Sequence, residues 1–160
     1  MRTITATRYH DISCGHRVHG HEGKCALLHG HNYRIHFTCE AEANSHMLDK
    51  VGRVLDFSAI KVLLCQWLED YWDHRFLAWD KDLLMLSLGN GPDPFDLGSG
   101  AKLWEMLTES IVWVPFNPTA ENMAAHLLEV VGPQQLVGTN VRLVRVTVDE
   151  TRKCSATAGA

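Results

Sequence analysis

Two copies of the motif His-Gly-His stand near the start of the chain, at residues 19–21 and 29–31. On a β-strand, side chains two residues apart point to the same face, so each copy could offer two imidazoles to one metal ion. Zinc in catalytic sites usually takes three protein ligands and keeps a fourth position for water or substrate. The third ligand must come from another element, and His16 is the best candidate because it follows the first predicted strand.

The residues that follow each copy distinguish the two. The second copy runs into apolar side chains at alternate positions, whereas the first is followed by Glu-Gly-Lys, with no such alternation. A buried histidine pair needs hydrogen bonds or a metal to offset its desolvation. We therefore predict that His29 and His31 are metal ligands on the inward face of a strand. His19 and His21 are predicted to face solvent on a loop. With ten histidines in the chain, the alternative is a chance pair without a metal.

Four further side chains are candidates for moving protons. Cys25 follows Lys24, whose charge favours the thiolate; the alternative is a small buried hydrophobe. Asp73 directly precedes His74, and an aspartate that holds a histidine in one tautomer prepares a general acid or base; the alternative is an exposed helix terminus. Glu150, near the end of the last predicted strand, could accept two N–H bonds from a guanidine-like ring edge; the alternative is a solvated charge.

The elements that must position these side chains follow from the periodicity of apolar residues. They are strands over residues 2–12, about 30–42 and about 140–151, and helices over about 56–72 and about 117–133. Asp56 and Thr119 are expected to cap the two helices, and Gly132–Pro133 to end the second. This order indicates an α+β protein with a largely antiparallel sheet.

The length of 160 residues and a composition of 46% hydrophobic and 21% charged residues indicate one globular domain, residues 1–160. Within it, residues 80–114 form an insertion or long loop: residues 89–100 favour a surface loop and residues 102–110 a short helix. This insertion could be a lid, an interface element or a plain surface feature.

The formal net charge of −4 gives no general attraction to nucleic acid or to an anionic membrane, so a bound anion would need a local basic pocket. We find no apolar run long enough for a bilayer span and no signal peptide. Five scattered cysteines do not suggest a disulfide framework. These features favour a cytoplasmic protein with reduced thiols.

Six motifs, in order along residues 14–151, resemble the 6-pyruvoyl tetrahydropterin synthase and 6-carboxytetrahydropterin synthase family. They are CGHRV, KCALLHGHNYRI, VLDFSAIK, WDHRFL, NPTAENMAAHL and VDET. Three residues separate Cys25 from the second His-Gly-His motif, which is similar to the carboxy-type branch, whereas the pyruvoyl-type branch tends to have a longer gap.

The resemblance implies the tunnelling fold (T-fold), in which an antiparallel sheet with two helices on one face assembles into an oligomeric barrel. Members of the family are commonly homohexamers with active sites between subunits. The resemblance also implies a zinc ion held by His16, His29 and His31.

The same resemblance implies roles for the other candidates. Cys25 would be the proton acceptor, His74 would relay protons under the orientation of Asp73, and Glu150 would anchor the pterin ring and join the relay. The implied substrate is 7,8-dihydroneopterin triphosphate. The carboxy-type products are 6-carboxy-5,6,7,8-tetrahydropterin, acetaldehyde and triphosphate, on the route to queuosine and other 7-deazaguanines.

Two alternatives stay open. One is a pyruvoyl-type enzyme, which eliminates triphosphate but keeps the three-carbon side chain; the other is a non-catalytic metal-binding protein on the same fold. A triphosphate must meet helix N-termini or basic side chains, and Lys24, Arg17 and Arg53 are candidates.

The chain also departs from the family pattern in three places. The first is residues 80–114, which are longer than the compact family pattern. After Glu150 it lacks the aromatic and basic residues that usually end the last short strand of the family. Whether this chain forms that strand is therefore left open. Arg75 stands where the family often has a second histidine.

Overall fold

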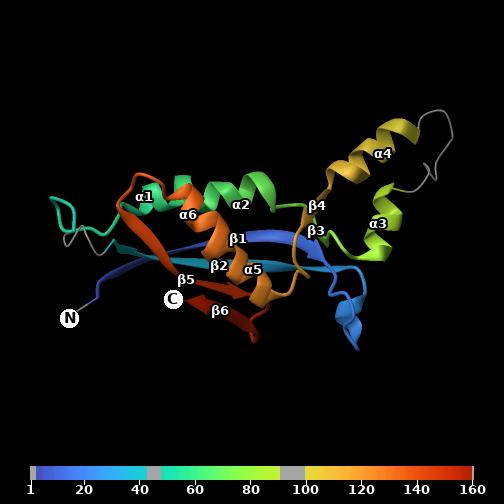
Figure 1. Ribbon diagram of the computed structural model, residues 1–160, viewed down its shortest axis with the longest axis horizontal. Helices are drawn as coiled ribbons and strands as arrows, with labels where there is room; N and C mark the ends of the chain where they lie inside the picture. Colours follow the sequence, from blue (N-terminus) through green and yellow to red (C-terminus); the bar gives the residue numbers. More distant parts are fainter. Residues whose placement is uncertain (1–2, 43–47, 91–99, 160) are drawn as a thin grey trace.

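The computed structural model describes residues 3–42, 48–90 and 100–159, and the strands in these ranges form one six-stranded sheet (Figure 1). The strand order is β4-β3-β1-β2-β5-β6. The strands are β1 (Thr5–His16), β2 (His29–Ala41), β3 (Phe76–Trp79), β4 (Ile111–Val114), β5 (Val141–Asp149) and β6 (Ser155–Gly159). With the helices that pack against this sheet, the predicted α+β class is confirmed.

The sheet is antiparallel along β1, β2, β5 and β6, as the sequence predicted. Two strands were not predicted: β3 pairs parallel with β1, and β4 pairs parallel with β3. Each has four residues, too few to show the alternation by which a strand is recognised. The last strand, β6, forms against β5 although the chain lacks the expected aromatic and basic ending.

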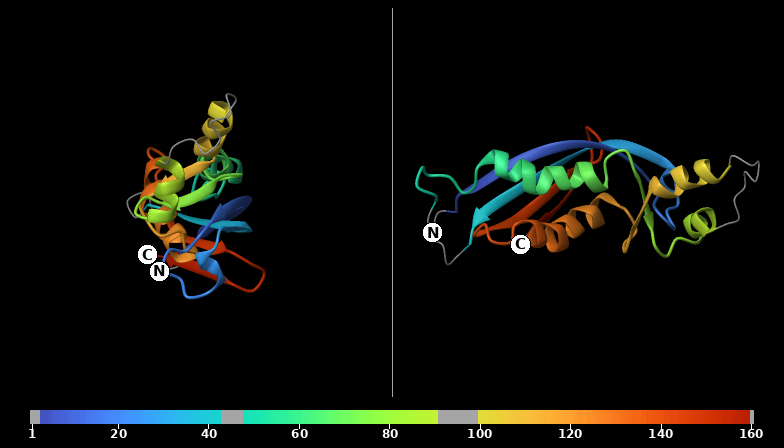
Figure 2. Two further views of the ribbon diagram at one scale, coloured as in Figure 1. Left: turned by 90° about the vertical axis from the view of Figure 1, so that its right-hand side faces the viewer. Right: turned by 90° about the horizontal axis from the view of Figure 1, so that it is seen from above.

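Two long helical stretches cover one face of the sheet (Figure 2), as predicted. Their apolar sides pack on the inward side chains of β1, β2 and β5. The helical segments are η1 (Lys24–Ala26), α1 (Phe57–Ile60), the π-helical η3 (Lys61–Cys65), α2 (Gln66–Tyr71), α3 (Leu83–Asn90), α4 (Gly100–Glu109), α5 (Ala120–His126), the π-helical η4 (Leu127–Val131) and α6 (Gly132–Gln135). In the described ranges, no helix is both long and apolar enough to cross a membrane.

Both predicted helix caps are confirmed. The Asp56 carboxylate accepts the backbone N–H of Ser58 at 2.8 Å, and the Thr119 hydroxyl accepts that of Asn122 at 3.2 Å. Each side chain satisfies an amide that has no partner inside its helix.

The predicted end of the second helix at Gly132–Pro133 is wrong, because the helix continues to Gln135. Gly132 has helical backbone angles, φ −54° and ψ −54°. A Cβ at this position would lie 2.6 Å from Cδ2 of Leu143 on β5. The glycine therefore serves the close approach of helix and sheet rather than a helix end.

The stretch 80–114 contains α3, α4 and β4, so its last residues belong to the sheet and not to an insertion. The short helix predicted over residues 102–110 is confirmed as α4. The surface loop predicted over residues 89–100 falls mostly on residues 91–99, which lie outside the described residues. Helices α3 and α4 extend beyond the end of the sheet where β1 finishes (Figure 1).

The long hairpin of β1 and β2 is the part of the fold that matters most for the site. β1 extends past its predicted end at residue 12, so His16 closes the strand and pairs with His29 at the start of β2. A Cβ on Gly30 would lie 2.8 Å from the carbonyl oxygen of Cys14. The glycine lets the two strands approach closely where the histidines meet.

Candidate metal centre and active site

The three predicted ligand histidines come together at the end of the β1–β2 hairpin. His16 and His29 are paired across the two strands, and His31 follows on the same face of β2. One ring nitrogen from each lies within 4.8 Å of those of the other two. Among the histidine, cysteine, aspartate and glutamate side chains of the described residues, these three histidines are the group close enough together to hold a metal ion.

The hydrogen bonds behind the rings fit a metal-binding role. His16 donates its Nδ1–H to the carbonyl oxygen of Pro118 at 2.6 Å, and His29 donates its Nδ1–H to that of Leu27 at 2.7 Å. Each Nε2 therefore carries the free lone pair. Backbone carbonyls commonly orient metal-bound histidines in this way.

Two of the three nitrogen atoms that face the cluster also lack a hydrogen-bond partner in the described part of the chain. The buried Nε2 atoms of His29 and His31 have no hydrogen-bond partner among the described residues. Burial lowers the pKa of His16 and of His31, which favours the neutral form that binds metals. Uncompensated buried nitrogen atoms are costly, and a metal ion held by the three imidazoles would satisfy them.

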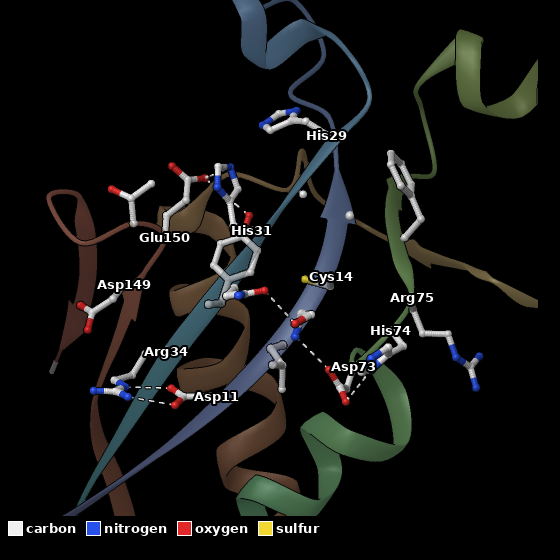
Figure 3. A pocket seen from close by; sticks show the side chains of 18 of the residues that line it. Asp11, Cys14, His29, His31, Arg34, Asp73, His74, Arg75, Asp149 and Glu150 are labelled. Carbon is white, nitrogen blue, oxygen red and sulfur yellow. Dashed lines mark hydrogen bonds and ion pairs between the residues drawn. The ribbon is translucent and has the colours of Figure 1, made fainter.

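Glu150, just after β5, points its carboxylate at the histidines (Figure 3). Its Oε1 lies 3.7 Å from Nε2 of His16 and 3.7 Å from Nε2 of His31. The Tyr33 hydroxyl lies 3.0 Å from Nε2 of His16 and 3.5 Å from Oε1 of Glu150. Burial raises the pKa of Tyr33, so the hydroxyl stays protonated and can donate to either neighbour.

The sequence analysis missed Tyr33 as a site residue, because its position matched the apolar stripe of β2. The sequence did carry one signal for this residue: the Tyr33 hydroxyl is a polar group on an otherwise apolar stripe, two residues after His31.

Asp73 and His74 follow α2 and are hydrogen-bonded to the backbone of Ser13 on β1. Oδ1 of Asp73 accepts the Ser13 N–H at 2.8 Å, and the His74 N–H donates to the Ser13 carbonyl at 2.8 Å. His74 in turn donates its Nδ1–H to Oδ2 of Asp73 at 2.8 Å. Burial raises the pKa of Asp73, but the hydrogen bonds from Ser13 and His74 outweigh it and leave the pKa below its usual value. Asp73 is thus an ionised carboxylate that fixes one tautomer of His74.

The backbone of His74 is unusual. Its φ is +56°, in the left-handed region that few residues other than glycine adopt, and its side chain is 83% exposed. Such strain is held by the surrounding structure and is often found at functional sites.

One cavity of about 1410 Å³ joins the histidines to the Asp73–His74 pair. His29, His31 and Glu150 lie on one side of it, and Asp73 with His74 on the other (Figure 3). The Cys14 thiol lies between them, and burial raises its pKa to about 12, so it is a neutral thiol.

Cys25 lies apart from this cavity. It sits in η1, partly buried, and is not one of the residues that line the cavity. The predicted solvent exposure of His19 and His21 is confirmed.

The basic side chains considered for a triphosphate do not line the cavity. Arg17 is paired with Asp82, Arg53 is paired with Asp49 and Asp56, and Lys24 is exposed on η1. The guanidinium groups that do line the cavity are those of Arg34, Arg75 and Arg152. Arg34 is itself paired with Asp11. The sequence could not tell these two sets apart, because the fold decides which arginine reaches the cavity.

A mixed sheet whose antiparallel β1–β2 hairpin carries three histidines, opposite an Asp–His pair, defines an α+β protein with a candidate metal centre. The family model described as 6-pyruvoyl tetrahydropterin synthase matches residues 5–160. The chain therefore belongs to the 6-pyruvoyl tetrahydropterin synthase family.

Individual relatives agree with this assignment. The chain is 31% identical to a 6-carboxy-5,6,7,8-tetrahydropterin synthase of Rickettsia felis, over 94% of this chain and 96% of that protein. It is 33% identical to a probable 6-carboxy-5,6,7,8-tetrahydropterin synthase of Halobacterium salinarum, over 91% and 79%.

Among solved structures, an uncharacterized protein of Wolinella succinogenes superposes with a TM-score of 0.81 at 24% identity, covering 99% of both chains. The 6-pyruvoyl tetrahydropterin synthase of Caenorhabditis elegans superposes with a TM-score of 0.60 at 24% identity, covering 100% of this chain and 97% of that one. The predicted tunnelling fold is confirmed.

Proposed function

We propose that this protein is a 6-carboxy-5,6,7,8-tetrahydropterin synthase. It would convert 7,8-dihydroneopterin triphosphate and water into 6-carboxy-5,6,7,8-tetrahydropterin, acetaldehyde and triphosphate. The observation that carries the proposal is the cluster of three histidines, two of which have Nε2 atoms unpaired among the described residues and line a cavity that an oriented Asp–His pair also lines. The similar proteins of Rickettsia felis and Halobacterium salinarum bear the same name.

Zinc is the proposed metal, held by Nε2 of His16, His29 and His31. A set of three neutral imidazoles suits zinc and other borderline transition metals, whereas calcium and magnesium prefer oxygen ligands. When bound, zinc supplies Lewis acidity toward the oxygen atoms of a substrate. The two backbone carbonyls behind His16 and His29 keep the donor nitrogen atoms aimed at one point.

The proton-moving roles fall to the remaining residues. Elimination of triphosphate and cleavage of a carbon–carbon bond both need protons to leave carbon and oxygen atoms of the substrate. Cys25 would accept a proton at Sγ. His74 would exchange protons at Nε2, because its Nδ1–H is committed to Asp73.

Glu150 would hold the pterin. Its carboxylate lines the cavity beside the histidines, and it could accept two N–H groups from the amino-pyrimidine edge of the ring. This contact would place the side chain of the substrate next to the three histidines and within the cavity shared with His74.

The assembly and setting belong to the same proposal. The protein would form a homo-oligomer, a hexamer by family resemblance, and act in the cytoplasm on the route to 7-deazaguanines such as queuosine. The wide exposure of His74 supports an oligomer, because a general acid or base works best where water is excluded. Light scattering on the purified chain tests this point.

The deciding experiment incubates the zinc-loaded protein with 7,8-dihydroneopterin triphosphate and identifies the products by mass spectrometry. We expect 6-carboxytetrahydropterin with acetaldehyde. Release of triphosphate without acetaldehyde would instead establish the pyruvoyl-type reaction. No consumption of substrate would support a non-catalytic metal-binding protein.

A further inference from the structure

A buried ion pair lies outside the site described above. The Asp82 side chain, just before α3, is 2% exposed, and that of Arg17, just after His16, is 11% exposed. Nη1 of Arg17 lies 2.6 Å from both carboxylate oxygen atoms of Asp82. The same carboxylate accepts the backbone N–H of Leu84 at 3.1 Å, at the start of α3.

The other side of the Arg17 guanidinium reaches the turn that carries Cys25. Nε of Arg17 donates to the carbonyl oxygen of Ala26 at 2.9 Å, and Ala26 directly follows Cys25. The carbonyl of Cys25 itself accepts the N–H of Val18 at 2.8 Å. One arginine therefore links Asp82 to η1.

Stability alone does not require such a pair. Two charges lose their hydration on burial, and apolar side chains of similar size are often as stabilising as a buried ion pair. What an arginine adds is direction, because its planar fork fixes the angles of the groups that it binds. Without the pair, η1 would keep the backbone bond from Val18 but lose its tie to α3.

We propose that Arg17 and Asp82 are positioning residues that hold Cys25 in place relative to the three histidines. This inference rests on the proposed function, in which Cys25 accepts a proton from the substrate. It also assigns a role to Asp82, in the first part of residues 80–114, which is to hold the loop between β1 and β2. Displacement of a catalytic group by about 1 Å can lower the reaction rate by on the order of 10²-fold.

The test compares Arg17→Lys with Arg142→Lys. Lysine keeps the charge but cannot bridge Asp82 and Ala26 at once. Arg142 is a matched control, since it pairs with Glu40 on the surface of the sheet and lines no part of the cavity. Asp82→Asn is a second variant, which keeps size and an acceptor for Leu84 if Arg17→Lys fails to fold.

Three measurements are made on each protein: zinc content, steady-state kinetics (kcat and KM), and hydrogen exchange of the peptide that contains Cys25. For Arg17→Lys we expect full zinc content, faster exchange in this peptide, kcat lower by on the order of 10²-fold and a nearly unchanged KM. The control should match the wild type in all three.

Each contrary result overturns a stated part. Unchanged exchange in both Arg17→Lys and Asp82→Asn would show that the pair does not brace the turn. Faster exchange with wild-type kcat would show that the position of Cys25 does not limit turnover. If the wild-type protein itself has no turnover, the proposed function fails, while the exchange measurement still decides whether the brace exists.

Discussion

At the scale of the residue, the site depends on which ring nitrogen each histidine turns toward its neighbours. His16 and His29 donate Nδ1–H to backbone carbonyl oxygen atoms, so the choice of tautomer is made outside the cluster. His31 brings its unpaired Nε2 from the next inward position of β2. Three donors of one kind are thus arranged before any metal arrives, which lowers the cost of binding.

Replacing a ligand should therefore remove the metal. For His31→Ala we expect zinc affinity to fall by more than the roughly 10–100-fold that loss of an outer hydrogen-bond partner costs. Metal analysis after gel filtration measures the bound zinc. His19→Ala, in the solvent-facing copy of the motif, is the control and should keep its metal. Full zinc content in His31→Ala would remove this residue from the ligand set.

Cys25 should matter for turnover and not for the metal. For Cys25→Ala we expect normal zinc content and a kcat lower by about 10²–10⁴-fold, the usual contribution of a general base. Cys154→Ala, at an exposed cysteine, is the matched control. Wild-type turnover in Cys25→Ala would exclude the thiolate as the proton acceptor.

Asp73 should act through His74. In Asp73→Asn the side chain keeps its size but can no longer favour the tautomer with the proton on Nδ1, so kcat should fall by on the order of 10²–10⁴-fold. KM should change little, since Asp73 is not proposed to hold the pterin. Asp70→Asn, on the exposed end of α2, is the control. Equal kcat values in the two variants would count against the proposed relay.

At the scale of the element, the β1–β2 hairpin sets the spacing of the ligands. Alternation along β2 predicted which side chains face inward, because the period of a strand is two and one face must be buried. The partners of those side chains could not be predicted in the same way. Pro118 contacts His16, and Ser13 contacts Asp73 and His74, through packing between segments far apart in sequence, and no local pattern encodes such contacts.

The same limit explains the elements that the sequence missed. β3 and β4 are stabilised by their parallel neighbours rather than by a pattern of their own. Gly132 resembled a helix end, whereas it permits contact with Leu143. The sequence shows that a glycine stands at this position, but the reason for the glycine is its packing against another element.

Gly30 offers a test of the hairpin. A Cβ at Gly30 meets the backbone oxygen of Cys14 at 2.8 Å, and backbone cannot turn aside as a side chain can. We expect Gly30→Ala to lower the free energy of unfolding by roughly 1–3 kcal/mol and to weaken metal binding, because the strands must separate beside the ligands. Denaturant titration and metal analysis measure both effects.

Gly159→Ala is the control for this substitution, since its Cβ would come no closer than 3.6 Å to a neighbouring atom on the edge strand β6. It should stay within about 0.5 kcal/mol of the wild type. Similar losses of stability for both glycines would mean that strand propensity, and not the approach of β1, decides the effect.

At the scale of the whole molecule, folding places several histidines where they are neutral. Burial lowers the pKa of His126, which lies against the rings of Trp72 and Phe116. Burial lowers the pKa of His16 and His31 as well. The unfolded chain takes up protons on these groups at a higher pH than the folded one does, so protonation favours unfolding.

The metal-free protein should accordingly be most stable above the ordinary histidine pKa of about 6.5 and lose stability as the pH falls below it. Thermal unfolding with a chelator, between pH 8 and pH 5, measures this loss. In His126→Phe the loss should be smaller than in the wild type. His21→Gln, on the solvent-facing loop, should keep the wild-type slope. An unchanged slope in His126→Phe would show that His126 does not contribute.

Much of what holds the site together is main chain. The Ser13 backbone grips Asp73 and His74, and the carbonyl oxygen atoms of Leu27 and Pro118 hold two of the histidines. Every amino acid carries a carbonyl group, and every amino acid except proline carries an N–H. Mutations at these anchor positions can therefore accumulate without releasing the groups they support. Such a site can be kept while the sequences of relatives diverge. A search for conserved side chains would not find the residues whose backbone holds the site.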